Sequence, residues 1–227
     1  MAKIILHQWE ISPFCGKVRK ILALKKLRYE TVDYAGVRAP LVKKLSFAGK
    51  LPVLDYDDIR IQDSTDIARF LEQRHPEPAL YPADTVERAQ ALLLEDWADE
   101  SFYWYEVFLR SEFEDAFKTT LKLFCKERPR WEWEIFGFFF HRIVRKQLRG
   151  QGLGRQSRET VISNYFDLLA SLDAILSQRE WLAGSAQSIA DIAVSAQLDE
   201  MVRTSQFAPR ILEHKGIAAW LARCKTP

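Results

Sequence analysis

Cysteine is scarce in this 227-residue chain, and the three that occur lie far apart. Cys15, Cys125 and Cys224 have neither the density of a disulfide framework nor the close pairs of a zinc site. The four histidines share no ligand spacing either. The sequence therefore predicts no disulfide and no metal, and scattered thiols of odd number indicate the reducing cytoplasm.

Long apolar runs and an excess of one charge are also missing. No stretch reaches the roughly 18 apolar residues that a membrane-spanning helix needs, and no apolar run follows a basic start. Lys and Arg number 33 against 31 Asp and Glu, so the net charge of +2 gives no general case for a nucleic acid partner. We expect a globular cytoplasmic protein without a membrane span.

The first 76 residues alternate strand and helix patterns. Strands are predicted at 4–7, 29–33, 52–56 and 59–61, and helices at 13–26, 39–45 and 64–74. In chain order these elements form a βαβαββα unit. Three prolines among residues 75–82 prevent a helix from continuing, so we interpret 77–83 as a linker.

From Asp84 onward the patterns are almost all helical. Asp84 followed by Glu87 predicts a capping box for a helix through about Glu112, and Ser188 followed by Asp191 predicts another. Further helices are predicted at 118–126, 131–148, 158–178, 188–202 and 216–224. The predicted fold is an α/β thioredoxin-like domain over residues 1–76, followed by an all-α helical bundle over residues 84–227.

The turn that begins at Ser12 connects an apolar strand to an amphipathic helix, with Pro13 suited to the first helical position. N–H groups in the first turn of a helix lack partners and carry partial positive charge, which favours an anion such as a thiolate. Ser12 stands where a thioredoxin-like redox enzyme keeps its attacking cysteine. The sequence therefore predicts activation of another molecule's sulfur, with simple helix capping by Ser12 as the alternative. Four basic residues of the helix are expected to be largely solvated: Lys17, Arg19, Lys20 and Lys25.

Two further segments offer groups to the same ligand. In the segment Gly49–Leu54 a proline begins a strand, and a cis bond there would turn the preceding backbone toward a ligand. In the segment Gln62–Thr65 an acid and a hydroxyl precede a helix, which provides an acceptor for an ammonium group and N–H donors for a carboxylate. Helix capping is again the alternative. A ligand with a thiol, a neighbouring peptide group and an α-amino acid end would contact all three segments.

These motifs resemble the cytosolic glutathione transferase superfamily over nearly the whole chain. The resemblance is carried, in order, by S-P-F-C-x-K-V-R, G-K-x-P-V-L, an Asp-Ser pair before a helix, and W-L-A-G followed by S-I-A-D-I-A. It implies a homodimer that conjugates glutathione, as co-substrate, to small apolar electrophiles. It also implies a role for each site residue. Ser12 would contact the glutathione sulfur, and Val53, which follows Leu51 and a cis-Pro52, would pair with the backbone of the cysteinyl unit. Asp63 and Ser64 would hold the γ-glutamyl end, and Lys50 would lie near the glycyl carboxylate.

Two other functions stay open at this point. Cys15 lies one turn after Ser12, where a helix N-terminus lowers a thiol pKa, so a glutathione-dependent thiol reductase is an alternative; otherwise Cys15 is a packing residue. The segment 150–155 is similar to metaxin-like members of the superfamily, which leaves a non-catalytic module that binds glutathione or a partner.

Aromatic and basic residues of the second half have two interpretations each. Trp9, Trp97 and Trp104 are predicted to form the electrophile pocket, although Trp9 could simply pack. The aromatic residues between 131 and 140 are expected to be packing material, with a pocket or partner-facing patch as the alternative. One helical face is basic, and we expect it to be solvated unless it meets an anionic partner or membrane surface: Arg142, Arg145, Lys146 and Arg149.

Overall fold

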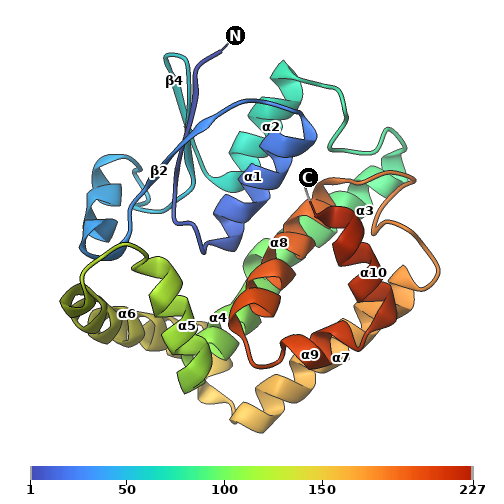
Figure 1. The fold of residues 1–227 in the computed structure, drawn as a ribbon. Helices are drawn as coiled ribbons and strands as arrows, with labels where there is room; N and C mark the ends of the chain where they lie inside the picture. The colour runs from blue at the N-terminus through green and yellow to red at the C-terminus, as the bar shows by residue number, and fades with distance from the viewer. Residues whose placement is uncertain (1, 226–227) are drawn as a thin grey trace.

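The computed structural model describes residues 2–225, and its N-terminal part is one sheet covered by helices (Figure 1). The strand order is β2-β1-β3-β4, with β1 parallel to β2 and antiparallel to β3, and β3 antiparallel to β4. The predicted βαβαββα order is confirmed. The strands are β1 (Ile4–Gln8), β2 (Glu30–Asp33), β3 (Val53–Tyr56) and β4 (Ile59–Gln62).

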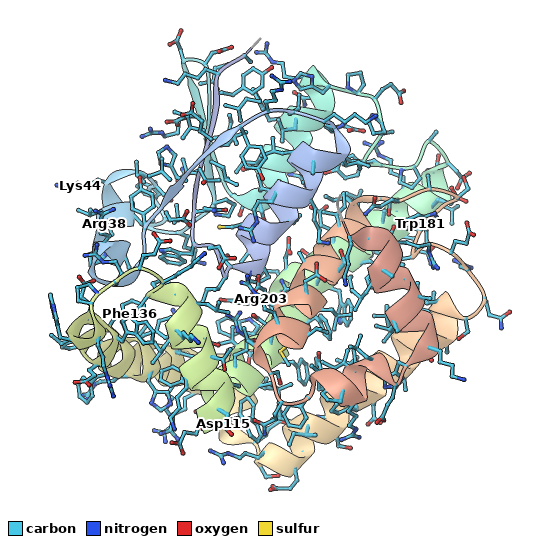
Figure 2. All side chains as sticks on the ribbon, in the orientation of Figure 1. Arg38, Lys44, Asp115, Phe136, Trp181 and Arg203 are labelled. Carbon is cyan, nitrogen blue, oxygen red and sulfur yellow. The ribbon has the colours of Figure 1, made fainter. Side chains whose placement is uncertain are left out.

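Two α-helices of this part, α1 (Pro13–Leu24) and α2 (Ser64–Arg74), pack on the sheet through Val18, Ile21 and Ile67. The helix predicted at 39–45 is instead a 3₁₀-helix, η1 (Gly36–Lys44). It contains a proline, whose missing N–H weakens α-helical pairing. The exposed side chains of η1 lie at the outer edge of the molecule, as Arg38 and Lys44 show in Figure 2.

The rest of the chain is helical, which confirms the predicted second half of the fold. The helix expected from 84 to 112 is three consecutive segments, because a π-helical stretch, η2 (Trp97–Phe102), separates two α-helices. A short helix near 208–212 and a 3₁₀ turn, η3 (Leu153–Arg155), were not predicted. The α-helices are α3 (Thr85–Asp96), α4 (Tyr103–Ser111), α5 (Glu114–Phe124), α6 (Arg130–Gln151), α7 (Arg158–Leu176), α8 (Ile189–Thr204), α9 (Ala208–Leu212) and α10 (Lys215–Cys224).

The prediction that the basic residues of α1 are solvated is wrong for three of the four. Lys17 is only 1% exposed, and Lys20 and Lys25 are also buried, whereas Arg19 is half-buried. A different part of the fold covers each lysine. Lys17 lies against α3 and η2, and Lys25 lies against α2 and the segment that follows it. Lys20 lies against α8, which packs along α1 (Figure 1). Each buried lysine therefore has a carboxylate partner: Glu95 and Asp99 for Lys17, Asp199 for Lys20, and Glu72 for Lys25.

The capping box predicted at the start of α8 is present. The carboxylate of Asp191 accepts the Ser188 N–H at 2.9 Å, the Leu182 N–H at 2.9 Å and the Trp220 indole N–H at 2.8 Å. Asp191 is fully buried, and burial raises the pKa of its carboxyl. One side chain thus joins α8 to the preceding loop and to α10.

The first predicted cap of the helical part, Asp84, is also observed. Its carboxylate accepts the N–H groups of Val86 and Glu87 at 2.9 and 3.0 Å. Residues 75–84, just before it, contain no helix or strand. Within residues 2–225, no helix is both long and apolar enough to cross a bilayer.

Candidate functional site

The sheet register brings the three predicted ligand segments to one edge. Val53, at the start of β3, lies opposite His7 of β1 and opposite Gln62 of β4. Since β1 and β4 both end there, the turn containing Ser12 and the segment beginning at Asp63 leave the sheet on either side of the start of β3. The fold thus gathers residues 9–12, 50–53 and 62–64 in one place.

Ser12 is the N-cap of α1, and its geometry also leaves it free to donate. Its Oγ accepts the Cys15 N–H at 3.4 Å, and its own N–H donates to the Trp9 carbonyl at 3.0 Å. Ser12 is 9% exposed. Accepting a bond occupies one lone pair of a hydroxyl and leaves its hydrogen available. Capping and sulfur contact are therefore compatible roles for this side chain.

The segment before β3 has the backbone that the sequence predicts, because the Leu51–Pro52 peptide bond is cis. The Glu77–Pro78 bond is also cis, which the sequence analysis did not foresee. Val53 belongs to the ladders with both β1 and β4, whereas Leu51 lies outside them. Lys50 is exposed, so its ammonium group can reach a ligand.

The third segment combines an exposed acid with a buried hydroxyl. Asp63 caps α2 by accepting the Thr65 N–H at 2.8 Å and the Asp66 N–H at 3.3 Å, in a backbone with a φ of 75°. Ser64 is only 3% exposed. The Phe47 N–H donates to Gln62 Oε1 at 2.9 Å, which ties the loop containing Lys50 to the end of β4.

A buried ion cluster next to this segment links the two halves of the chain. Lys17 Nζ lies 2.6 Å from Glu95 Oε1 and 2.6 Å from Asp99 Oδ2. Thr65 Oγ1 accepts from Lys17 at 3.1 Å and donates to Glu95 at 3.1 Å. Burial raises the pKa of Asp99, an effect that Lys17 partly opposes. The cluster fixes the start of α2, immediately after Ser64, against α1 and α3.

The sequence patterns did not predict this cluster, although they contain one signal of it. Glu95 and Asp99 are four residues apart, a spacing that places both carboxylates on one side of a helix. Two acids at that spacing can share one cation. Nothing in the sequence indicates that the cation is Lys17, 78 residues earlier.

Helices α4 and α5 cover the turn that contains Ser12. The rings of Trp9 and Phe124 are 5.6 Å apart, and those of Phe14 and Tyr103 are 4.7 Å apart. Arg110, which is ion-paired with Glu106, donates from Nη1 to the Ile11 carbonyl at 3.3 Å. The helical half thus holds the backbone on both sides of Ser12.

The three tryptophans predicted to form the electrophile pocket do not lie around one cavity. A cavity of about 160 Å³ lies beside Trp9, between the end of β1 and α5. Trp97 and Trp104 do not line it: Trp97 stacks on Phe102 at 4.7 Å, and Trp104 packs against the main core. The cavity is lined by Trp9, Glu10, Asp33, Ala35, Leu123, Phe124, Lys126 and Glu127.

Cys15 is placed poorly for the redox alternative. Its side chain is fully buried, and burial raises the pKa of its thiol to about 11, although hydrogen bonding to Ser12 acts in the opposite direction. A thiol with this pKa is protonated at neutral pH, and the thiolate is the form that attacks a disulfide. Its position therefore favours the packing role. Among residues 2–225, no group of three or more His, Cys, Asp or Glu side chains could hold a metal ion.

A second charged network, next to the Ser12 turn, contains a carboxyl that titrates near neutrality. Glu200 is buried in α8, and burial raises its pKa from 4.5 to about 7, against the opposing effect of Arg110 and Arg203. Arg203 binds Glu200 at 2.7 Å and Glu10 at 2.5 Å. The network therefore connects α8 to the turn that carries Ser12.

Glu200 is expected to make the protein progressively less stable as the pH rises from about 4.5 to about 7. A carboxyl whose pKa is raised on folding stabilises the fold fully below its unfolded pKa, and this contribution is lost through the folded pKa. Between pH 4.5 and 8 the loss is about 3 kcal/mol for a shift from 4.5 to about 7. Glu200→Gln should remove that part of the pH dependence in urea unfolding. The exposed control Glu213→Gln should keep it, and identical slopes for Glu200→Gln and wild type would refute the assignment.

Comparison with solved structures shows which proteins share this arrangement. The crystal structure of the β-etherase LigF from Sphingobium sp. strain SYK-6 superposes with a TM-score of 0.70, at 23% identity, over 97% of this chain and 94% of that one. A glutathione S-transferase from Methylobacillus flagellatus KT, with glutathione bound, superposes with a TM-score of 0.65, at 22% identity, over 97% and 94%. At these identities the likeness establishes the fold.

Sequence comparison adds relatives and domain families. FtsZ-localized protein A of Caulobacter vibrioides is 26% identical over 203 residues, 85% of this chain and 75% of that protein. LigF is 25% identical over 200 residues, 80% of this chain and 72% of its own. Residues 6–79 match the glutathione S-transferase N-terminal domain family, and residues 154–226 match the C-terminal domain family. With both halves of the fold matched in order, the chain belongs to the glutathione S-transferase superfamily.

Proposed function

We propose that this protein is a glutathione transferase, with its domain boundary in residues 77–83. The observation that carries the proposal is the meeting of Ser12, the Leu51–Pro52 segment and the Asp63–Ser64 pair at one edge of the sheet. These groups match a sulfur, a peptide backbone and an α-amino acid in that order. Glutathione bound in a structural neighbour of the same fold supports the choice of ligand.

In the proposed reaction, Ser12 is a hydrogen-bond donor to the glutathione sulfur. A thiol with a pKa of about 8.5 is about 3% ionised at pH 7, and lowering the pKa by about two units requires about 2.7 kcal/mol. A hydroxyl donor at the N-terminus of α1 is a reasonable source of this stabilisation. The thiolate then forms a bond to the electrophilic carbon, and the leaving group takes the electron pair of the bond that breaks.

The remaining contacts to glutathione follow from which groups the sheet leaves free. We assign the cysteinyl backbone to Leu51 rather than Val53, because both neighbours of Val53 are strands. Asp63 is exposed and can accept from the γ-glutamyl ammonium group, with Ser64 beside it. Lys50 is exposed and can pair with the glycyl carboxylate. The electrophile would lie in the cavity beside Trp9, whose volume of about 160 Å³ limits it to a small molecule.

Replacing Ser12 with alanine tests this proposal. We expect kcat/KM for conjugation of 1-chloro-2,4-dinitrobenzene to fall about 10- to 100-fold at pH 7, because the thiolate loses its donor. The deficit should shrink at pH 9, where most of a thiol ionises unaided. Calorimetric titration with glutathione should still show saturation. Full activity of Ser12→Ala at pH 7 would show that Ser12 does not stabilise the thiolate.

Cys15→Ala is the matched variant for the redox alternative. It should keep conjugating activity, since its buried thiol takes no part in the proposed reaction. Loss of glutathione-dependent disulfide reduction in this variant, together with activity of Ser12→Ala, would instead assign the protein as a thiol reductase. The two variants therefore separate the two chemistries.

A non-catalytic binding module is the second candidate, and one observation favours it. Phe124 packs against Trp9 and leaves little space beside the Ser12 turn. One relative is named for its localisation with FtsZ, which fits a role in assembly. Saturable glutathione binding without conjugation of any electrophile in a broad panel would support this function over the transferase.

A further inference from the structure

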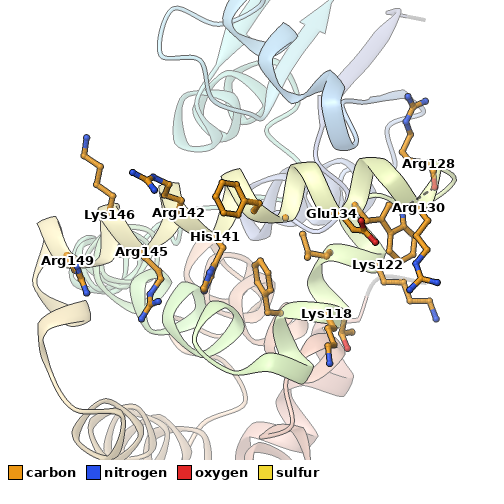
Figure 3. A pocket seen from close by; sticks show the side chains of 16 residues that line it. Lys118, Lys122, Arg128, Arg130, Glu134, His141, Arg142, Arg145, Lys146 and Arg149 are labelled. Carbon is orange, nitrogen blue, oxygen red and sulfur yellow. Dashed lines mark hydrogen bonds between the residues drawn. The ribbon is translucent and has the colours of Figure 1, made fainter.

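A groove lies between α5 and α6, away from the candidate glutathione site (Figure 3). Its volume is about 1340 Å³, larger than the roughly 300–1,000 Å³ of pockets that enclose small molecules. None of its lining residues belongs to the segments around Ser12, Leu51 or Asp63. The groove is therefore a separate feature, of a size that suits a segment of polypeptide.

The charge of the groove is strongly one-sided. Its lining includes eight Lys and Arg side chains and a single carboxylate, that of Glu134. Three of the basic residues are neutralised by partners: Lys118 by Glu114, Arg128 by Glu132 and Arg145 by Glu112. The other five have no ion pair within residues 2–225: Lys122, Arg130, Arg142, Lys146 and Arg149.

These basic side chains gather at the two ends of the groove. In Figure 3, Arg142, Arg145, Lys146 and Arg149 lie at one end, whereas Lys118, Lys122, Arg128 and Arg130 lie toward the other. The two groups come from the C-terminal part of α6 and from the region where α5 and α6 meet. An occupant that spans the groove would therefore meet positive charge at both of its ends.

The middle of the groove is mostly apolar, with His141 among the side chains that line it (Figure 3). Phe117 and Leu121 of α5 face Trp133 and Phe138 of α6, and Phe138 is 65% exposed. Gly137 lies between them, and a Cβ added there would be 2.8 Å from Leu121 Cδ1, so the two helices are in close contact. One exposed apolar side chain is ordinary, but several neighbouring ones that form a patch indicate an interaction site. More of them continue along the outer face of α6: Trp131, Ile135, Phe139 and Ile143.

We propose that this groove binds an acidic, amphipathic segment of a partner protein. Its apolar side chains would pack on Phe117 and Phe138, and its carboxylates would pair with the free basic residues at each end. Helices that bind in grooves use this combination of apolar anchors and flanking charge. Charge complementarity of this kind steers association and selects the partner.

The shape of the site favours a peptide over the other anionic partners. A bilayer is flat and would meet the exposed apolar residues on the outer face of α6, which leaves the half-buried Phe117 and Leu121 of α5 without a role. A nucleic acid would use the basic ends but leave the apolar middle without a partner, because its backbone is charged along its whole length. A protein segment with alternating apolar and acidic side chains uses both parts of the groove.

Selection from a displayed library of random peptides tests the proposal. The peptides should be about 15 residues long, enough for four helical turns. On the wild-type protein we expect enrichment of sequences with Asp and Glu between apolar residues at helical spacing. Enrichment of peptides that are not acidic, or no enrichment at all, would overturn the proposal.

Charge reversal then locates the binding site. Arg142→Glu with Lys146→Glu should weaken the selected peptides about 10- to 100-fold in fluorescence anisotropy, because like charges would face each other. Phe138→Ser should weaken them about tenfold, and since Phe138 is exposed this change leaves the core intact. The control Arg28→Glu with Arg179→Glu makes the same charge change at exposed positions outside the groove and should have no effect. Equal affinity for all variants would overturn the proposal.

Two further probes test the alternative partners. The first probe is vesicles that contain phosphatidylserine, which are sedimented with the same variants. The second is a short DNA duplex, which is titrated with them. Binding of either one that is lost on Arg142→Glu with Lys146→Glu, in the absence of selected acidic peptides, would replace the proposal with a membrane or nucleic acid site. Calorimetric titration of the same variants with glutathione measures the candidate glutathione site separately. A failure of the groove proposal can therefore be distinguished from a failure of the transferase proposal.

Discussion

Lys17→Met is expected to lower the free energy of unfolding by about 3–5 kcal/mol. Lys17 is the cation shared by Glu95 and Asp99, and its removal would leave two buried carboxylates next to each other. Removing one partner of a buried ion pair costs this much because the remaining charge has lost both water and its counter-ion. Urea unfolding followed by circular dichroism at pH 7 measures the loss.

Two comparisons make this result specific. The exposed Lys3→Met should cost less than about 0.5 kcal/mol. Combining Lys17→Met with Glu95→Gln and Asp99→Asn should recover part of the stability, since no unpaired charge then remains. A loss for Lys17→Met no larger than for Lys3→Met would mean that the cluster adds nothing to stability.

Asp191→Ala is expected to be comparably destabilising, by about 3–5 kcal/mol. The change leaves the Leu182 N–H, the Ser188 N–H and the Trp220 indole N–H without an acceptor in the core. Each unsatisfied buried donor costs about 1–3 kcal/mol, although such costs do not add fully. Thermal unfolding and urea unfolding should agree on the loss.

Asp84→Ala is the matched control for this prediction, because it removes an N-cap of the same chemistry at the surface. Asp84 bonds only the N–H groups of Val86 and Glu87, which water can reach. Its loss should cost about 1 kcal/mol. If Asp191→Ala is no worse than Asp84→Ala, the bonds to Leu182 and Trp220 contribute little.

Local chemistry explains what the sequence could predict. The capping box at Ser188, the N-cap at Asp84, the strand that leads to Ser12 and the proline at the start of β3 depend on neighbouring residues, and all are observed. The reciprocal bond from Glu87 that would complete a box at Asp84 is not among the bonds of the described residues. The order of strands and helices in the first half follows from short patterns of the same kind. The gathering of Ser12, Leu51 and Asp63 then follows from the sheet register, which the resemblance to a known superfamily made predictable.

Long-range packing explains what could not be predicted. Lys17 lies in a pattern typical of a solvated face, and only the position of α3 and η2 shows that it is buried. Trp97 is predicted in the pocket because its helix is expected to run beside the thiol site, whereas in the structure it stacks on Phe102 and lies partly buried against the core. The exposed aromatic face of α6 has the same explanation. The sequence cannot show that Phe138 stays exposed because no other helix of the described residues covers it.

The buried lysine of α1 also limits how a ligand can enter. Lys17 joins α1 to α3, while Thr65 adds the start of α2 to the same junction. A hinge motion that moved the two halves apart would have to separate these paired charges in an environment without water. Substrates should therefore arrive through movement of surface side chains and loops, with the two halves of the molecule moving as one rigid frame.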